Sequence, residues 1–174
     1  MSMCKIKLFL TDVDGCLTDG GMYYSAKGEE LKRFCVYDGM AMVLLREAGI
    51  PCGILTSEQS PVVKARAEKL KIDFLYLGVG SRVNGECLTK KQAALRICDK
   101  LKITLADVCF VGDDVNDIDL LSAVGFPCCP PNARPEVKAV ARANGALADI
   151  HILNTPGGHG AIRELADYIL ATFM

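Results

Sequence analysis

Two acidic clusters stand directly after apolar runs of the sequence. Asp12 and Asp14 follow the run at residues 5–11, and Asp113 follows the run at residues 108–111. If the two runs are neighbouring parallel strands, Asp12 and Asp113 converge beyond the carboxyl end of a sheet, where ligands bind in open α/β folds. Carboxylates gathered there repel one another unless a cation is present, and a set of oxygen ligands favours Mg²⁺. Either cluster alone is also typical of a helix cap or a turn.

Hydroxyl and ammonium groups stand where a phosphate site would need them. Thr56 and Ser57 follow an apolar run at residues 52–55, so a hydroxyl and backbone N–H groups at this point could hold phosphate oxygens. Lys90 and Lys91 open a helical pattern, and one ammonium there would balance the carboxylates and a phosphoryl group. Thr56 could instead be a cap, and one of the two lysines could belong to a solvated helix face.

These side chains need a framework of strands and helices to position them. Alternating apolar runs and helical patterns with short connections predict an α/β fold, a doubly wound and mostly parallel sheet. We expect residues 1–174 to form a single domain, since no linker, repeat or low-complexity stretch divides the chain. The predicted strands are residues 5–11, 52–55, 74–77, 108–111 and a weaker 150–153, and the predicted helices are residues 40–48, 61–70, 90–101, 116–124, 135–143 and 161–172.

Two segments interrupt this alternation. Residues 20–34 have the pattern of a β-hairpin with its turn at residues 26–29, inserted directly after the first strand. Residues 78–88 include a glycine-rich loop whose role the sequence leaves open. This loop lacks both the GxGxxG spacing and a GK[ST] ending, so neither nucleotide-binding fingerprint applies.

Composition excludes several classes of protein. The 174 residues include 20 Lys and Arg against 21 Asp and Glu, and a net charge of −1 argues against a nucleic-acid or membrane-surface partner. Residues 1–7 lack the apolar core of a signal peptide, and no apolar run approaches the roughly 18 residues of a membrane span. Nine cysteines without a CxxC pair, several of them inside apolar segments, indicate reduced thiols. We therefore expect a cytoplasmic enzyme.

The motifs together resemble a known family. Asp12-Val13-Asp14-Gly15, Leu55-Thr56, Lys90 and residues 112–117 are similar, in order, to the four motifs of the haloacid dehalogenase (HAD) superfamily. Residues 12–20, 53–56, 66–70 and 157–164 resemble its cap-less phosphatases of sugar-acid biosynthesis, which act on 3-deoxy-D-manno-octulosonate 8-phosphate or on the 9-phosphates of 2-keto-3-deoxynononate and N-acylneuraminate. This resemblance covers almost the whole chain and implies a HAD-like Rossmann-type fold without a cap domain.

The resemblance also implies a mechanism for Mg²⁺-dependent phosphomonoester hydrolysis. Asp12 would attack phosphorus and form an aspartyl-phosphate. Asp14 would protonate the leaving hydroxyl and then accept a proton from the attacking water. Thr56 and Lys90 would stabilise the phosphoryl group; Lys90 is preferred to Lys91 because its distance to the next strand matches the family spacing. The implied metal ligands are Asp12, Asp113 and the main-chain oxygen of Asp14, with Asp114 and Asp117 supporting them from behind.

Substrate choice and assembly are also inferred from the resemblance. In the octulosonate phosphatases an Arg usually occupies the position of Glu58, so Glu58, next to the substrate-binding candidate Ser57, favours a nine-carbon acid. Lys69 also matches the nine-carbon group and would reach the substrate carboxylate from a neighbouring subunit of a homotetramer built around the hairpins. A flexible segment at residues 157–160 would close over the substrate, with His159 as a hydrogen-bond partner. The alternative for Glu58 and Lys69 is an exposed ion pair that contributes little.

Two other functions remain to be separated from this one. A phospho-accepting receiver domain of signalling proteins also has an acidic Mg²⁺ site, a Thr and a Lys, but its phosphorylated Asp follows a middle strand, where this chain has Thr56. A catalytically inactive HAD-like assembly module would have lost the carboxylate of Asp12 or Asp14, and both are present. The sequence therefore favours an active phosphatase.

Overall fold

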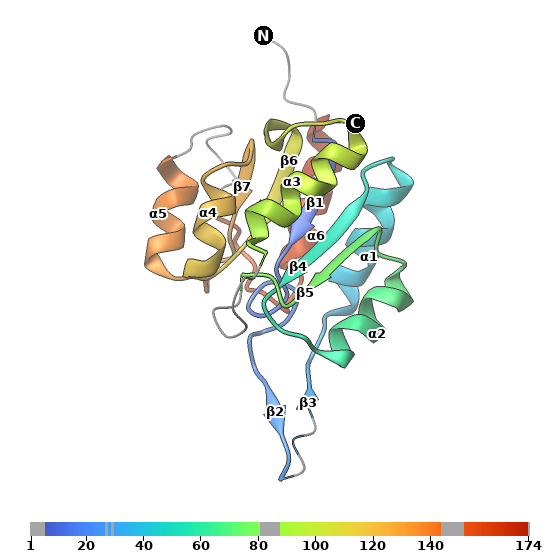
Figure 1. Cartoon of the computed structure of the whole chain (residues 1–174), viewed down its shortest axis with the longest axis vertical. Helices are drawn as coiled ribbons and strands as arrows, with labels where there is room; N and C mark the ends of the chain where they lie inside the picture. Colours follow the sequence, from blue (N-terminus) through green and yellow to red (C-terminus); the bar gives the residue numbers. More distant parts are fainter. Residues whose placement is uncertain (1–5, 27, 29, 81–87, 144–151, 174) are drawn as a thin grey trace.

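A parallel five-stranded sheet forms the centre of the protein in a computed structural model (Figure 1), which describes residues 6–26, 28, 30–80, 88–143 and 152–173. The strand order is β5-β4-β1-β6-β7, and every neighbouring pair is parallel. The strands are β1 (Leu8–Thr11), β4 (Cys52–Thr56), β5 (Phe74–Leu77), β6 (Val108–Val111) and β7 (Phe126–Cys128). The predicted doubly wound α/β fold is confirmed, and no cap domain accompanies the sheet within the described residues.

Helices cover both faces of this sheet because the strand residues alternate between two cores. Phe9 and Cys109 pack with residues of α1, α2 and α6, whereas Leu10 and Phe110 pack with residues of α3, α4 and α5. The helices are α1 (Val36–Glu47), α2 (Pro61–Leu70), α3 (Lys90–Leu101), α4 (Ile118–Leu121), α5 (Pro135–Ala143) and α6 (Ala161–Phe173). None of the helices in the described part of the chain is both long and apolar enough to cross a membrane.

Local capping fixes where the helix that carries Lys90 begins. Thr89 is the N-cap of α3 and accepts a hydrogen bond from the backbone N–H of Gln92, whose side chain in turn accepts one from the backbone N–H of Thr89. This reciprocal capping box sets the first turn of α3. Lys90 is consequently the first helical residue, at the end of the helix nearest the carboxyl edge of the sheet.

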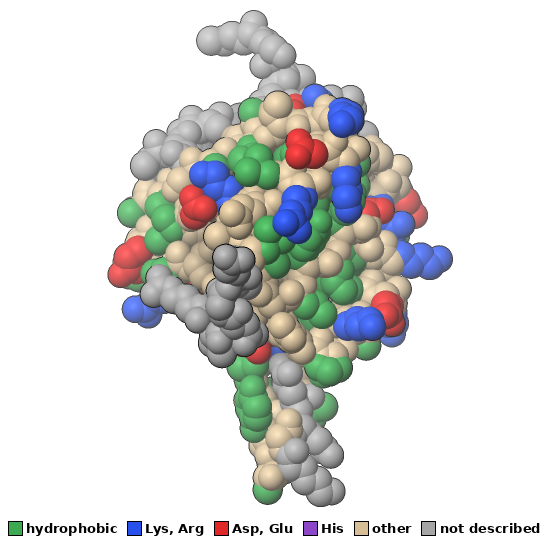
Figure 2. All heavy atoms as spheres, viewed as in Figure 1, with side chains coloured by type: hydrophobic (Ala, Val, Ile, Leu, Met, Phe, Trp, Pro, Cys, Tyr) green, Lys and Arg blue, Asp and Glu red, His purple; other side chains and the backbone are tan. Residues whose placement is uncertain are grey.

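A two-stranded arm, residues 19–34, projects away from the body of the protein (Figure 1). Its strands β2 (Tyr23–Tyr24) and β3 (Glu30–Leu31) are antiparallel, and an isolated bridge between Thr18 and Phe34 closes its base. The predicted hairpin is present, although its turn includes positions outside the described residues. Apolar side chains lie exposed along the arm (Figure 2), Tyr24 and Leu31 among them.

Two predicted elements differ from the structure, and one strand was not predicted. The helix predicted over residues 116–124 is a 3₁₀ turn, Val115–Asp117, followed by the single turn of α4, because Asp117 turns its side chain back to the preceding loop. Strand β7 was not predicted, since Pro127 interrupts the apolar pattern; proline is tolerated on an edge strand such as this one. The weak strand at residues 150–153 is seen as one parallel bridge between Ile152 and Cys129, and its first two residues lie outside the described part.

Candidate active site

The carboxyl ends of three adjacent strands meet at one cavity. Asp12 follows β1, Thr56 ends β4, and Asp113 follows β6. The cavity has a volume of about 280 Å³. It is lined by Asp12, Asp14, Gly15, Gly20, Thr56, Ser57, Glu58, Asp113, Asp114 and Asn116. The two acidic clusters of the sequence therefore converge, as expected from neighbouring parallel strands.

Lys90 lies behind Asp12 and joins two carboxylates. Its Nζ lies 2.8 Å from Oδ2 of Asp12 and 2.6 Å from Oδ1 of Asp117. The Lys90 side chain is only 1% exposed, and the two carboxylates keep its pKa above the ordinary lysine value despite burial. Lys91 instead forms an exposed ion pair with Asp119. Of the two candidate lysines, only Lys90 reaches the site.

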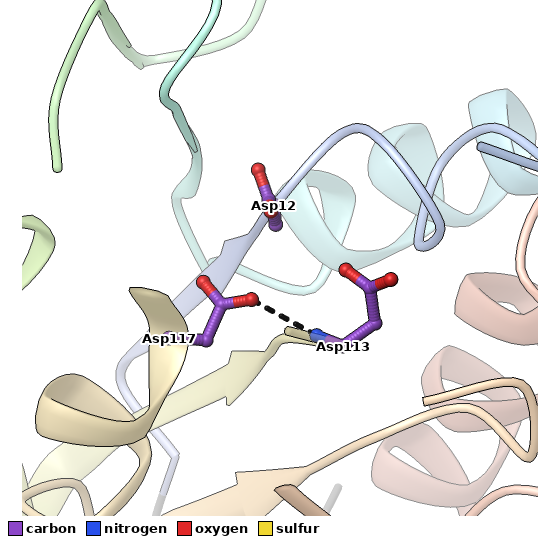
Figure 3. Close-up of side chains that lie close together, drawn as sticks. All are labelled: Asp12, Asp113 and Asp117. Carbon is purple, nitrogen blue, oxygen red and sulfur yellow. Dashed lines mark hydrogen bonds between the residues drawn. The ribbon is translucent and has the colours of Figure 1, made fainter. Parts of the chain in front are cut away.

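Negative charge exceeds positive charge at this point of the protein. One carboxylate oxygen of each of Asp12, Asp113 and Asp117 lies within 4.8 Å of the others, and Figure 3 shows the three side chains together. Lys90 forms ion pairs with two of them, Asp12 and Asp117. Burial, followed by the neighbouring charges, raises the pKa of Asp113 to about 8; burial, only partly opposed by Lys90, raises the pKa of Asp12 to about 7. Both shifts reflect an environment that disfavours further negative charge. An all-oxygen set with this charge excess fits a hard divalent cation such as Mg²⁺.

Asp117 fixes the loop that presents Asp113. Its Oδ2 accepts a hydrogen bond from the backbone N–H of Asp113 at 2.9 Å (Figure 3). The same oxygen accepts one from the backbone N–H of Asp114 at 3.2 Å. Gly112 is required here, because a Cβ at this position would lie 2.6 Å from the Asp117 side chain. Asp114 lines the cavity and its Oδ1 accepts a hydrogen bond from the backbone N–H of Val115. Asp117 thus contacts the loop that it was expected to support, whereas Asp114 is part of that loop and lines the cavity itself.

Glycine is equally necessary at position 15, which follows Asp14 and packs against the side chain of Asp113. Its φ of +83° lies in the left-handed region, and a Cβ there would come within 1.9 Å of Oδ2 of Asp113. Any larger residue at position 15 would therefore displace the Asp113 carboxylate from the cavity. This explains physically why glycine follows the Asp-x-Asp pair.

Asp14 lies at the cavity wall and receives contacts from the base of the arm. Lys32 Nζ lies 2.6 Å from Oδ1 of Asp14, and the Thr18 hydroxyl donates to the same oxygen at 3.4 Å. The Asp14 side chain is 26% exposed, so it remains open to the cavity. Lys32 was not predicted to be a site residue from the sequence. The signal for such a role was its position two residues before Phe34, where the hairpin returns to the domain.

The opposite wall carries hydroxyl and amide groups. The buried Thr56 hydroxyl accepts a hydrogen bond from the backbone N–H of Glu58 at 3.2 Å. Ser57 donates to the carbonyl of Val79 at 3.0 Å and accepts from the side-chain amide of Asn116 at 2.8 Å. Thr56, Ser57 and Glu58 all line the cavity, as does Asn116, which the sequence reading did not select.

Lys69 and His159 lie away from this cavity within a single chain. Lys69 is exposed near the end of α2 and lines a separate hollow with Arg46 and Glu47. Glu58 and Lys69, both within the described part of the chain, do not pair with one another, so the exposed ion pair offered as the alternative is not formed. His159 is exposed, with Nε2 3.4 Å from Arg33 Nη1.

The segment at residues 157–160 is tied to the DxDG loop by hydrogen bonds in this structure, and its closure over a substrate stays a prediction. Asn132 bridges the DxDG loop to it, donating to the carbonyl of Gly15 at 2.9 Å and accepting from the backbone N–H of Gly157 at 2.8 Å. A Cβ on Gly157 would lie 1.8 Å from the carbonyl oxygen of Gly15. The glycines therefore permit close backbone packing, and Asn132, also missed from sequence, fixes the contact.

Comparisons with known proteins agree with this geometry. A family model of haloacid dehalogenase-like hydrolases matches residues 27–125. The 3-deoxy-D-manno-octulosonate 8-phosphate phosphatase KdsC of Haemophilus influenzae is 34% identical over 166 residues, covering 95% of this chain and 83% of the relative. KdsC of Escherichia coli K12 is 32% identical, covering 95% of this chain and 80% of the relative. The chain therefore belongs to the haloacid dehalogenase-like hydrolases, and within them it is a phosphatase.

Solved structures extend the similarity to three dimensions. The 3-deoxy-D-manno-octulosonate 8-phosphate phosphatase from Moraxella catarrhalis, in complex with magnesium ion, phosphate ion and a KDO molecule, matches with a TM-score of 0.83 at 34% identity, covering 95% of this chain and 86% of that one. The cobalt-bound Haemophilus influenzae phosphatase matches with a TM-score of 0.85 at 32% identity, covering 99% and 92%. The family resemblance seen in the sequence is confirmed, and the receiver-domain and inactive-module alternatives are set aside.

Proposed function

We propose that the protein hydrolyses the phosphate monoester of a 2-keto-3-deoxy sugar acid through an aspartyl-phosphate on Asp12. The observation that carries the proposal is the buried pair of Asp12 and Lys90 at a cavity that also exposes Asp14. A carboxylate held against a lysine at the strand end is positioned as a nucleophile. Asp14, two residues further on, is placed to give a proton to the leaving oxygen and to take one from the attacking water.

The proposed cofactor is Mg²⁺. Asp12, Asp113 and the main-chain oxygen of Asp14 would hold it, and Asp117 would keep the Asp113 loop in place. When bound, the cation would neutralise the carboxylates and polarise the phosphoryl oxygens. The charge excess at Asp12, Asp113 and Asp117 supports this choice, as does the magnesium named in the Moraxella catarrhalis complex.

The side chains around the cavity have defined roles in the proposed reaction. Asp12 attacks phosphorus while Asp14 gives a proton to the departing sugar oxygen; water then attacks the aspartyl-phosphate while Asp14 takes a proton from it. Lys90 stabilises Asp12 and the transferring phosphoryl group. The Thr56 hydroxyl and the backbone N–H of Ser57 would donate to phosphoryl oxygens from the opposite wall.

For the substrate we propose a preference for a nine-carbon acid 9-phosphate. Glu58 lines the cavity and stands where octulosonate phosphatases usually have an Arg. A Glu at this position would accept hydrogen bonds from substrate hydroxyl groups, whereas an Arg would bind the substrate carboxylate. The second candidate is 3-deoxy-D-manno-octulosonate 8-phosphate, favoured by the names of the curated relatives.

The proposal includes a homotetramer assembled around the arms. The exposed apolar side chains of the arm support it, because an isolated hairpin is marginally stable and gains by pairing. In such an assembly Lys69 would contact the substrate bound to a neighbouring subunit. His159 would contact the substrate bound to its own chain. A cytoplasmic location and a single domain over residues 1–174 remain predictions.

The test is phosphate release with Mg²⁺ from octulosonate 8-phosphate, 2-keto-3-deoxynononate 9-phosphate and N-acetylneuraminate 9-phosphate. We expect hydrolysis of all three at different rates, the fastest with a nine-carbon acid, and none after chelation of the metal. Fastest turnover of the eight-carbon acid would contradict the preference assigned to Glu58 and leave the chemistry at Asp12 intact. No release from any of them would contradict the proposed function.

A further inference from the structure

The base of the arm and the predicted acid–base residue are joined by a buried contact. Lys32 follows β3 directly, and its Nζ lies 2.6 Å from Oδ1 of Asp14. Thr18, the partner of Phe34 in the bridge that closes the arm, donates to the same oxygen at 3.4 Å. Two residues at the arm's base therefore contact one carboxylate oxygen at the cavity wall.

Burial distinguishes Lys32 from its neighbours in the arm. The Lys32 side chain is 0% exposed, whereas Leu31 is 67% exposed and the Arg33 side chain is 50% exposed. Removing an ammonium from water is costly, and an apolar side chain in the same place is often as stable or more so. Here the charged Lys32 side chain is buried and the apolar Leu31 is exposed, which is the opposite of what the hydrophobic effect alone would favour. The inversion indicates that Lys32 is present for its contact with Asp14.

We propose that Lys32 is a positioning residue that holds Asp14 for proton transfer, an inference that rests on the proposed function. Lys32 holds Oδ1, and the Thr18 hydroxyl is shared between this oxygen and the carbonyl of Val13, so Oδ2 is the oxygen that exchanges the proton. In the first step the bond from phosphorus to the sugar oxygen breaks, the bond from Asp12 to phosphorus forms, and the proton on Asp14 Oδ2 moves to the sugar oxygen. In the second step water replaces Asp12 on phosphorus and its proton returns to Asp14 Oδ2.

This role predicts a dependence on the leaving group. An alkoxide must be protonated as it departs, whereas p-nitrophenolate departs without a proton. Misplacing Asp14 therefore slows the hydrolysis of alkyl phosphates more than that of aryl phosphates. The ratio kcat/KM isolates this effect, because it covers the steps up to the first irreversible one, departure of the leaving group.

The experiment compares wild type, Lys32→Met, Lys32→Arg and the control Lys91→Met with β-glycerophosphate and p-nitrophenyl phosphate, at saturating Mg²⁺. We expect Lys32→Met to lower kcat/KM for the alkyl ester about 10- to 100-fold and for the aryl ester less than about threefold. Lys32→Arg, which retains a cation, recovers most of the loss. Lys91→Met removes a lysine that also contacts an aspartate, on the surface, and leaves both values unchanged.

Equal losses on the two esters, or no loss on either, would overturn the inference. Light scattering and the unfolding temperature of each variant establish that assembly and folding are retained, and Lys32→Gln replaces Lys32→Met if the latter does not fold. Because both esters are generic substrates, failure of wild type on sugar-acid phosphates would contradict the proposed function separately from the role of Lys32.

Discussion

The carboxyl end of the sheet and the arm differ in how far their side chains are buried and paired within a single chain. At the sheet end, Asp12, Lys90 and Asp117 are buried. Lys90 pairs with both carboxylates, and each carboxylate also accepts a hydrogen bond from a backbone N–H. Along the arm, Tyr24 and Leu31 are about two-thirds exposed, at 66% and 67%. The groups assigned to bond breaking are therefore complete within one chain, whereas the arm presents an apolar surface that suits a second molecule.

The comparison predicts its largest effect at Lys90. In Lys90→Met protein, Asp12 and Asp117 lose their buried cation, so we expect kcat/KM to fall by at least about 10³-fold on any phosphomonoester. The free energy of unfolding of the metal-free protein should fall by about 3 kcal/mol, since an uncompensated buried charge remains. Steady-state kinetics and denaturant unfolding measure the two changes.

Lys91→Met is the matched control for this variant, because Lys91 follows Lys90 in the first turn of α3 and forms a surface ion pair with Asp119. We expect its free energy of unfolding to change by less than about 0.5 kcal/mol. Equal losses in the two variants would contradict the distinction between a buried and a surface lysine.

The arm predicts a different kind of loss. In the double variant Tyr23→Ser, Tyr24→Ser, we expect light scattering to show dissociation of the proposed homotetramer, because exposed apolar area is removed. The KM for the sugar-acid phosphate should rise about tenfold or more, while kcat/KM for p-nitrophenyl phosphate changes less than about threefold. A tetramer that survives this double substitution would show that the arm is not its main contact.

A smaller effect is predicted at Glu58, on the rim between the two regions. Glu58→Arg introduces the residue usual in octulosonate phosphatases and should shift the ratio of kcat/KM values toward the eight-carbon acid about tenfold. Competition between eight- and nine-carbon substrates, followed by product analysis, measures this ratio directly. An unchanged ratio would remove Glu58 from the specificity determinants.

The last predicted effect is a pH dependence of stability, which needs no substitution. Burial raises the pKa of Asp12 to about 7 and of Asp113 to about 8, from an unfolded value of 3.8. Between these limits the folded state binds more protons than the unfolded state, so metal-free stability falls as pH rises through the window from about 4 to about 8. We expect the unfolding temperature of chelated protein to fall by about 10 °C between pH 6 and pH 9, because both carboxyl groups lose their proton in that interval.

Mg²⁺ should oppose this loss, since it neutralises the carboxylates only when they are ionised. The rise in unfolding temperature on adding Mg²⁺ should therefore be larger at pH 9 than at pH 6. In Asp113→Asn protein the pH effect and the Mg²⁺ effect should both shrink. A metal-free protein that grows more stable between pH 6 and pH 9 would contradict the raised pKa values.

Much of the sheet and its acidic edge followed from the sequence, for a physical reason. The strand ends before Asp12, Thr56 and Asp113 are marked by short apolar runs, and parallel strands bring their carboxyl ends to one edge. The N-cap at Thr89 similarly located the start of the helix that carries Lys90. These features depend on local pattern and on the topology of a parallel sheet.

The contacts that the sequence did not reveal depend on tertiary packing. Lys32 contacts the Asp12–Gly15 loop from 18 residues further along the chain and Asn132 from 117 residues further, and neither stands in a recognisable motif. Residues 157–160 suggested flexibility because they are rich in glycine, yet the glycines serve close backbone packing. Strand β7 was missed because its proline is permitted only by its place at the edge of the sheet.

The most direct test of the account is to trap the phosphoryl group on the protein. Asp14→Asn protein is mixed with p-nitrophenyl phosphate and Mg²⁺ and quenched in acid within one turnover, and the modified peptide is identified by mass spectrometry. We predict one phosphoryl group, labile to hydroxylamine, on the peptide that contains Asp12, and none in Asp12→Asn protein. Phosphate release with no acyl-phosphate on Asp12, or trapping on another residue, would contradict nucleophilic attack by Asp12.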